Sequence, residues 1–256
     1  MKKQIPNVFT LLNLFFGCMA VVFALQTNEL VIYLNQDYNS SFNIPEKLTW
    51  AAICIGIAAL IDFLDGFLAR ALKATSPLGK ELDSLCDIVS FGVAPGALLY
   101  QLLRLSFARQ ENGLDVGLIW LLPAFILTCA AAYRLAKFNI DPSQSHVFRG
   151  VPVPAVGLLV ASFPLILHFN TLPGVSGFLV NKWFLYGLIA VLSWLMISRI
   201  PMLSLKFTTL KFRPNAPQYL LVLIALVGAF LLHWLAAPVV FVFYILFSLF
   251  TPNKTS

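Results

Sequence analysis

Long apolar stretches separated by short polar segments fill almost the whole chain. Eight of these stretches are long and apolar enough to form helices in a bilayer, and no nucleotide-binding strand pattern interrupts them. We therefore predict an all-α fold, a polytopic integral membrane helix bundle. The predicted spans are residues 7–32, 49–72, 82–105, 118–138, 154–169, 182–198, 219–235 and 238–250.

The last two predicted spans are short, and only a minimal turn around 236–238 joins them. We expect these two helices to form a C-terminal hairpin that is partly interfacial. The expected domain organisation is thus a six-helix membrane core over 1–206, followed by a two-helix hairpin over 207–256. The long polar loop 35–48 has no function that the pattern indicates.

Composition and charge narrow the possible functions. Hydrophobic residues make up 59% of the chain and charged residues 11%, with a mean hydropathy of +0.85, which excludes a water-soluble domain of this length. The net charge of +6 does not indicate nucleic-acid binding, because the basic residues are scattered between spans and form no stripe with interleaved aromatic residues.

Those scattered basic residues instead predict the topology. Only Lys47, Arg104, Arg109 and Lys182 fall on one face of the predicted bundle, so the other 13 of the 17 Lys and Arg fall on the face that holds both termini. The positive-inside rule then predicts that both termini are cytoplasmic, as in a multi-pass protein of the cell inner membrane.

Four carboxylates stand out inside the apolar sequence, namely Asp62, Asp65, Asp83 and Asp87. A carboxylate at the bilayer centre costs about 2.5 to 3.5 kcal/mol, so four would cost roughly 10 kcal/mol without compensation. Asp62 and Asp65 share a helical stripe at i, i+3, and Asp83 and Asp87 share one at i, i+4. The segment 71–80 contains Pro77 and Gly79 and turns the chain back, so the two acidic faces can meet.

This arrangement predicts a metal site at the predicted cytoplasmic face. Oxygen ligands without His or Cys nearby favour Mg²⁺ or Mn²⁺ over Zn²⁺. The alternative interpretation is a pair of solvated helix ends, which the apolar flanks make less attractive.

The acidic residues belong to the pattern D-x-x-D-G-x-x-A-R, then eight residues, then G-x-x-x-D-x-x-x-D, over 62–87. This pattern matches the signature of the CDP-alcohol phosphatidyltransferases at every fixed position. Further segments resemble the phosphatidylserine synthase branch of that family: 5–13 (IPNVFTLLN), 90–95 (SFGVAP), 134–139 (RLAKFN), 148–154 (FRGVPVP) and 198–206 (SRIPMLSLK).

The resemblance implies transfer of a phosphatidyl group from CDP-diacylglycerol to an alcohol, catalysed by two divalent cations in a homodimeric enzyme that works among membrane lipids. It implies that Asp62, Asp65 and Asp83 are chiefly metal ligands. It assigns the general base to Asp87, which also remains a possible ligand.

The same resemblance implies contacts with the nucleotide and phosphates of CDP-diacylglycerol at two groups of residues. For Asn7 and Thr10, which with Asn13 follow an i, i+3, i+6 series, capping and helix packing are alternatives. For Arg70, phosphate binding through its forked donors competes with a snorkelling surface role. The residues assigned in this way are Asn7, Thr10, Gly66, Ala69, Arg70, Ser76 and Gly79.

The acceptor alcohol is predicted to be L-serine, because the further segments resemble the serine branch. A cluster on the predicted cytoplasmic face offers partners for the serine carboxylate, namely Arg134, Lys137, Asn139 and Arg149. The alternative for each cation is binding lipid phosphate or setting topology. Glycerol phosphate or an inositol compound is the alternative acceptor, and a divalent-cation transporter is the alternative from another class.

Overall fold

The computed structural model describes residues 4–26, 46–74, 76–109, 115–140, 149–169, 174–203 and 215–250. Nearly all of these residues are helical, and the described part contains no strand beyond one isolated bridge between Arg149 and Pro201. The all-α prediction is therefore confirmed. The α-helices are α1 (Ile5–Leu25), α2 (Glu46–Ala71), α3 (Pro77–Ile88), α4 (Ala94–Ala108), α5 (Ile126–Ile140), α6 (Val153–Phe169), α7 (Val175–Leu179), α8 (Lys182–Ile197), α9 (Ala216–Leu232) and α10 (Ala236–Phe250).

Helix starts follow local chemistry that the sequence carries. Pro6 lies in the first turn of α1, where its missing N–H is harmless. The Ser76 hydroxyl caps α3 by accepting a hydrogen bond from the Gly79 N–H, and Pro77 occupies the first turn. The Asn181 side chain caps α8 by accepting from the N–H groups of Trp183 and Phe184.

The predicted third span begins earlier than expected and runs through α3, η2 (Val89–Val93) and α4 as one helical stretch. The segment η2 is a π-helical turn, and the Ala94 N–H bonds to the Val89 carbonyl instead of the Ser90 carbonyl. A π turn inserts one extra residue and rotates the side chains on either side of it relative to each other. It therefore sets the face of α3 independently of the face of α4.

Small residues allow neighbouring helices to pack closely against η2. A Cβ added at Gly17 of α1 would meet the Ser90 Oγ and lie 2.9 Å from the Ser90 Cα, and one at Gly157 of α6 would lie 3.1 Å from the Phe91 Cβ. On the α5 side, the Thr128 hydroxyl donates to the Gly92 carbonyl at 2.9 Å. The π turn is thus held on three sides, and Phe91 is fully buried between its neighbours.

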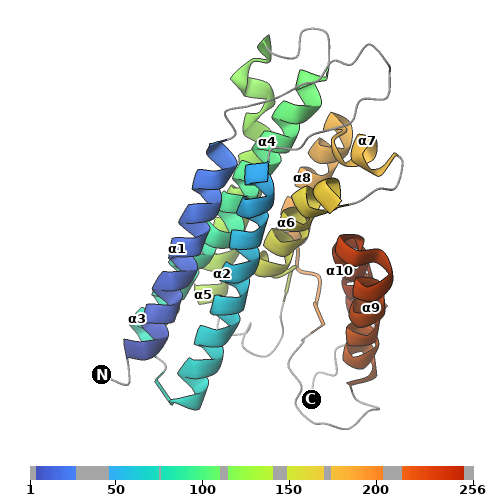
Figure 1. Cartoon of the computed structure of the whole chain (residues 1–256). Coiled ribbons are helices and arrows are strands. Elements are labelled where there is room, and N and C mark those ends of the chain that lie inside the picture. The colour runs from blue at the N-terminus through green and yellow to red at the C-terminus, as the bar shows by residue number, and fades with distance from the viewer. Residues whose placement is uncertain are drawn as a thin grey trace.

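Figure 1 shows α1 and α2 side by side along much of their length, and α6 packs against α2. By length and composition, five helical stretches in the described part are able to cross a membrane: Ile5–Leu25, Glu46–Ala71, Pro77–Ala108, Leu118–Ile140 and Ala216–Phe250. The helices α6 and α8 are shorter but also apolar. A polytopic membrane bundle is therefore confirmed.

The stretch Ala216–Phe250 is folded back on itself, because His233 has a positive φ of 52° and η8 (His233–Leu235) breaks the helix there. The helices α9 and α10 consequently pack against each other as a hairpin at the side of the core (Figure 1). The break comes a few residues earlier than the predicted turn at 236–238, since Ala236 and Pro238 form the first turn of α10.

We predict that Gly17→Ala destabilises the protein by about 1 to 3 kcal/mol, because the new methyl group overlaps Ser90 and forces α1 away from η2. Gly56→Ala in α2 is the matched control, since nothing lies within 4 Å of its added Cβ. Thermal unfolding in detergent micelles measures both. Equal unfolding temperatures for the two variants would show that the contact between Gly17 and Ser90 is not tight.

Candidate active site

Three of the four predicted carboxylates converge. Asp62 on α2 and Asp83 and Asp87 on α3 each place one carboxylate oxygen so that the three atoms lie within 4.8 Å of one another. The connection between the helices makes this possible, because Lys73 adopts a positive φ of 50° and the Ala74 N–H bonds back to the Ala69 carbonyl at 2.9 Å. The acidic ends of α2 and α3 therefore face each other, as the sequence predicted.

Asp65 lies beside this cluster and faces α1. Its side chain is 5% exposed and lies next to Thr10, and its Oδ2 has no hydrogen-bond partner in the described part of the chain. The helical period explains the separation from Asp62, since residues three apart differ in direction by about 60°. Asp65 is thus a buried carboxylate with an unused oxygen at the edge of the cluster.

The donor set fits a divalent cation. Four carboxylates, two of them less than 8% exposed, would repel one another in an apolar bundle. A bound cation removes that repulsion, and the unpaired Asp65 Oδ2 has the chemistry of a hard oxygen ligand. No His lies in the cluster of described residues, which favours Mg²⁺ or Mn²⁺.

Asn13 on α1 completes the inner wall of the site. It is fully buried, and its Nδ2 donates to the Asp87 Oδ1 at 3.3 Å. The backbone carbonyl oxygen of Asn13 accepts a hydrogen bond from the Ser90 hydroxyl at 3.1 Å, which ties the same residue to the π turn. Asn13 therefore holds one oxygen of Asp87 from the α1 side.

Three residues predicted to contact the nucleotide meet at the beginning of α3. A Cβ added at Gly79 would lie 3.1 Å from the Ser76 Oγ and 3.2 Å from the Asn7 Oδ1. The Ser76 hydroxyl accepts from the Gly79 N–H, so its own hydrogen remains available as a donor. An exposed helix N-terminus with a free hydroxyl and a glycine is well suited to a phosphate group.

The other predicted nucleotide contacts lie on the last turns of α2 and on α1. The Arg70 side chain folds back over Gly66, with its Nη1 3.6 Å from the position of an added Cβ. Ala69 is partly exposed on the same part of the helix. Thr10 is buried, and its hydroxyl donates to the Pro6 carbonyl at 3.1 Å while the residue lies against Asp65.

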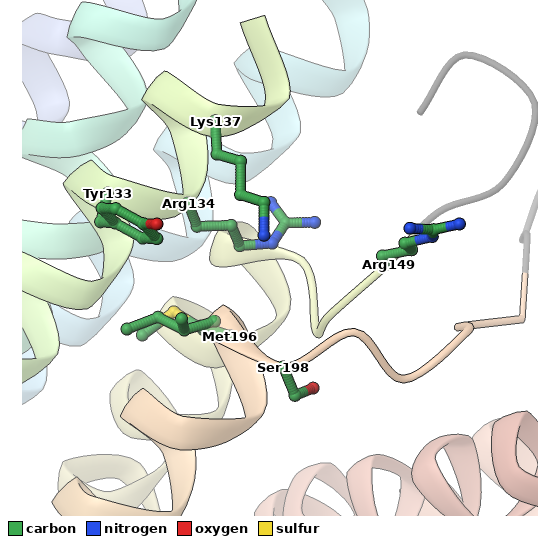
Figure 2. Close-up of a pocket in the computed structure, with 7 residues that line it drawn as sticks. Tyr133, Arg134, Lys137, Arg149, Met196 and Ser198 are labelled. Atoms are coloured by element: carbon green, nitrogen blue, oxygen red, sulfur yellow. The ribbon is translucent and has the colours of Figure 1, made fainter. Parts of the chain in front are cut away.

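A second site lies between the C-terminal ends of α5 and α8, which the predicted topology puts on the cytoplasmic side. It is a pocket in which the side chains of Arg134 and Lys137 lie side by side, while the Arg149 guanidinium points away from them (Figure 2). Arg134 donates weakly to the Gly150 carbonyl at 3.5 Å, and its buried Nε has no partner in the described residues. The pocket is lined by Tyr133, Arg134, Lys137, Arg149, Met196, Ile197 and Ser198.

The helices that carry the pocket and the acidic cluster are in contact. The helix α5, which carries Arg134, packs against α3, which carries Asp87. The unpaired guanidinium N–H of Arg134 gives the pocket a donor for an anionic group.

Asn139, the fourth member of the predicted cluster, does not join the pocket. Residues 134 and 139 differ in direction by about 140° on a helix, so Asn139 faces α3 instead. Its Nδ2 donates to the Ser84 Oγ at 3.0 Å and to the Glu81 carboxylate at 3.4 Å, and its backbone carbonyl accepts from the Lys80 ammonium. These contacts tie the end of α5 to the turn of α3 that carries Asp83.

Several contacts in these sites were not predicted from the sequence. The contacts of Asn13 with Asp87 and of Ser90 with Asn13 join positions more than 70 apart, so no local spacing points to them. Asn13 does lie on the same helical stripe as Asn7 and Thr10, and this spacing was the signal that it faces the site. Tyr133, Met196 and Ser198 enter the second pocket only because α5 and α8 pack together.

Comparison with known proteins gives consistent matches. A family model described as CDP-alcohol phosphatidyltransferase matches residues 3–208. A protein of Helicobacter pylori named CDP-diacylglycerol–serine O-phosphatidyltransferase is 32% identical over 224 residues, covering 86% of this chain and 79% of its own. Proteins with the same name from Bacillus subtilis (36% over 143 residues; 52% and 72% covered) and Mycobacterium leprae (32% over 213 residues; 80% and 64% covered) are also similar.

We predict that the purified protein binds Mn²⁺ without any substrate, and that Asp62→Asn or Asp83→Asn weakens this binding about tenfold or more. Removing one carboxylate charge from the cluster takes away a ligand and part of the attraction. Titration of free Mn²⁺ by electron paramagnetic resonance measures the affinity. Asp115→Asn, at an exposed carboxylate outside the cluster, is the control; identical Mn²⁺ affinity in all variants would exclude the cluster as the binding site.

Proposed function

The chain belongs to the CDP-alcohol phosphatidyltransferase family, and from this premise we propose that it transfers the phosphatidyl group of CDP-diacylglycerol to L-serine, releasing CMP. The reaction class follows from the family, and serine follows from the names of the similar proteins. The observation that supports the choice of acceptor is the Arg134 pocket on α5, the helix that packs against the Asp87 helix α3. We propose that the serine carboxylate binds Arg134 while the serine hydroxyl reaches Asp87.

The reaction forms a bond between the serine hydroxyl oxygen and the phosphorus of the phosphatidyl group, and breaks the bond from that phosphorus to CMP. Divalent cations held by Asp62, Asp65, Asp83 and Asp87 would neutralise the pyrophosphate and stabilise the departing CMP. The hydroxyl proton has to leave, and Asp87 is the proposed base for it.

Asp87 is well supported for that role by its surroundings. Asn13 occupies its Oδ1, so the carboxylate cannot rotate freely. An oxygen of the same carboxylate lies within 4.8 Å of oxygens of Asp62 and Asp83. A base whose orientation is fixed before the substrate arrives loses less entropy in the reaction.

The cytidine diphosphate group is proposed to lie between α1 and the connection from α2 to α3. The backbone N–H groups at the start of α3 and the Ser76 hydroxyl offer hydrogen bonds to phosphate oxygens. Arg70, which folds over Gly66, offers a charged fork to the same group. Asn7 and Thr10 line the α1 side, and Gly66, Ala69 and Gly79 leave room for the flat base and the pyrophosphate.

The proposed orientation puts this end of the bundle in the cytoplasm. Both substrates are then accessible, since serine dissolves in the cytosol and CDP-diacylglycerol presents its head group at the membrane surface. Support comes from the excess of Lys and Arg on the face that holds both termini.

The test is a reaction of purified protein with CDP-diacylglycerol, Mn²⁺ or Mg²⁺, and a panel of acceptors comprising serine, glycerol phosphate and inositol phosphate. We expect CMP release that depends on serine, together with phosphatidylserine identified by mass spectrometry. Chelation of divalent cations should abolish both products. CMP release that depends on a different acceptor would retain the reaction class but overturn serine.

Arg134→Lys tests the proposed carboxylate contact, because it keeps the charge but loses the planar fork. A charge-assisted hydrogen bond contributes about 1.5 to 3 kcal/mol, so we expect the serine KM to rise about tenfold or more with little change in the CDP-diacylglycerol KM. Arg104→Lys, on α4 at the opposite end of the bundle, is the control. If both variants keep the serine KM of the wild type, Arg134 does not bind serine.

A further inference from the structure

The hairpin of α9 and α10 lies beyond the residues 3–208 that match the family model. We propose that this hairpin positions the acceptor pocket, through two side chains of α10 that hold the chain leaving α8. The inference rests on the proposed function for the identity of the acceptor. Tyr244 and Ser248 are positioning residues in this proposal and do not contact a substrate.

The contact between hairpin and core is polar within an apolar surrounding. The Leu203 N–H donates to the Ser248 Oγ at 3.0 Å, and the Tyr244 hydroxyl donates to the Leu203 carbonyl at 3.4 Å. Both side chains are more than nine-tenths buried and stand one turn apart on the face of α10 that meets the core. Together they satisfy both backbone groups of one residue that belongs to no helix.

Hydrogen bonds to the backbone of Leu203 matter because this segment lies outside any helix. The segment after Ser198 has left α8, so its N–H and C=O groups lack helical partners. Where water is excluded, an unpaired backbone group costs several times what its hydrogen bond contributes in water. The two α10 side chains therefore select one path for the chain from Arg199 to Leu203.

That path determines where the wall of the pocket lies. Pro201 forms the isolated bridge with Arg149, and the Gly150 N–H donates to the Ile200 carbonyl at 2.9 Å. Gly150 has a positive φ of 74°, and a Cβ there would lie 3.0 Å from the Ser198 carbonyl oxygen. The segment 149–151 is thus fitted to the end of α8 and to the residues that follow it.

The last connection reaches the proposed serine contact. The Gly150 carbonyl accepts from the Arg134 guanidinium at 3.5 Å. Figure 2 shows Ser198 and the chain that follows it running between the pocket and the hairpin helices. A displacement of Leu203 would therefore be passed to Gly150 and then to Arg134.

The hairpin is also held to the core at its closed end. The rings of Phe169 on α6 and Trp234 in η8 stack at 6.2 Å between centroids, and α10 packs along α6. The hairpin is consequently fixed to the core at two points. It can therefore act as a rigid support for residues 199–203 and does not simply move with them.

Tyr244→Phe and Ser248→Ala, singly and together, test the proposal in the full-length protein. Loss of one neutral hydrogen bond corresponds to about fivefold, so we expect the serine KM to rise about fivefold in each single variant and further in the double variant. The CDP-diacylglycerol KM should stay within about twofold. Serine should also raise the unfolding temperature of the double variant less than that of the wild type, while CDP-diacylglycerol raises both equally.

Two variants separate positioning from general packing. Ser248→Thr keeps the hydroxyl and should retain the wild-type serine KM, whereas Ser162→Ala removes a buried hydroxyl that bonds only within α6 and should change nothing. A wild-type serine KM in a folded double variant overturns the proposal, and so does an equal rise in both KM values. Failure of the wild type to use serine at all would instead contradict the proposed function.

Discussion

The repulsion among buried carboxylates is the constraint on which the rest of the structure depends. Asp62, Asp83 and Asp87 meet within 4.8 Å, and Asp65 lies beside them with a buried unpaired oxygen. Without cations such an arrangement costs stability, which supports the proposal that these carboxylates hold metal ions for the reaction. The surrounding helices hold the carboxylates together through tight contacts elsewhere, in particular the contact of Gly17 with Ser90 and of Gly157 with Phe91.

The π turn connects that tight packing to the site. It begins two residues after Asp87, and its hydrogen bonds with Asn13 and Thr128 fix it from α1 and from α5. One extra residue in the turn lets α3 direct Asp83 and Asp87 toward α2 while α4 directs its own side chains into the core. An ordinary α-helix over 77–108 could not satisfy both demands with the same sequence.

Local spacing was sufficient to predict the fold class and the acidic cluster, because i, i+3 and i, i+4 relations survive in any helix. It failed where the answer depends on how helices pack. The π turn lies inside the predicted third span and depends on the helices packed around it, and Asn13 meets Asp87 across 74 positions. For Asn139, by contrast, local spacing held the answer. Asn139 is five residues from Arg134 and therefore lies on another face of the helix, where it binds Ser84 and Glu81.

In the proposed assignment, specificity and reactivity have different structural origins. The proposed reacting groups come from two consecutive helices and their turn, whose geometry follows from one short motif. The proposed acceptor pocket is assembled from α5, the segment 149–151, the end of α8 and, through Leu203, the hairpin. A pocket built from four distant segments can change by small displacements of any of them while the carboxylates stay in place. With this assignment, the acceptor that the enzyme uses can change while the acidic motif stays the same.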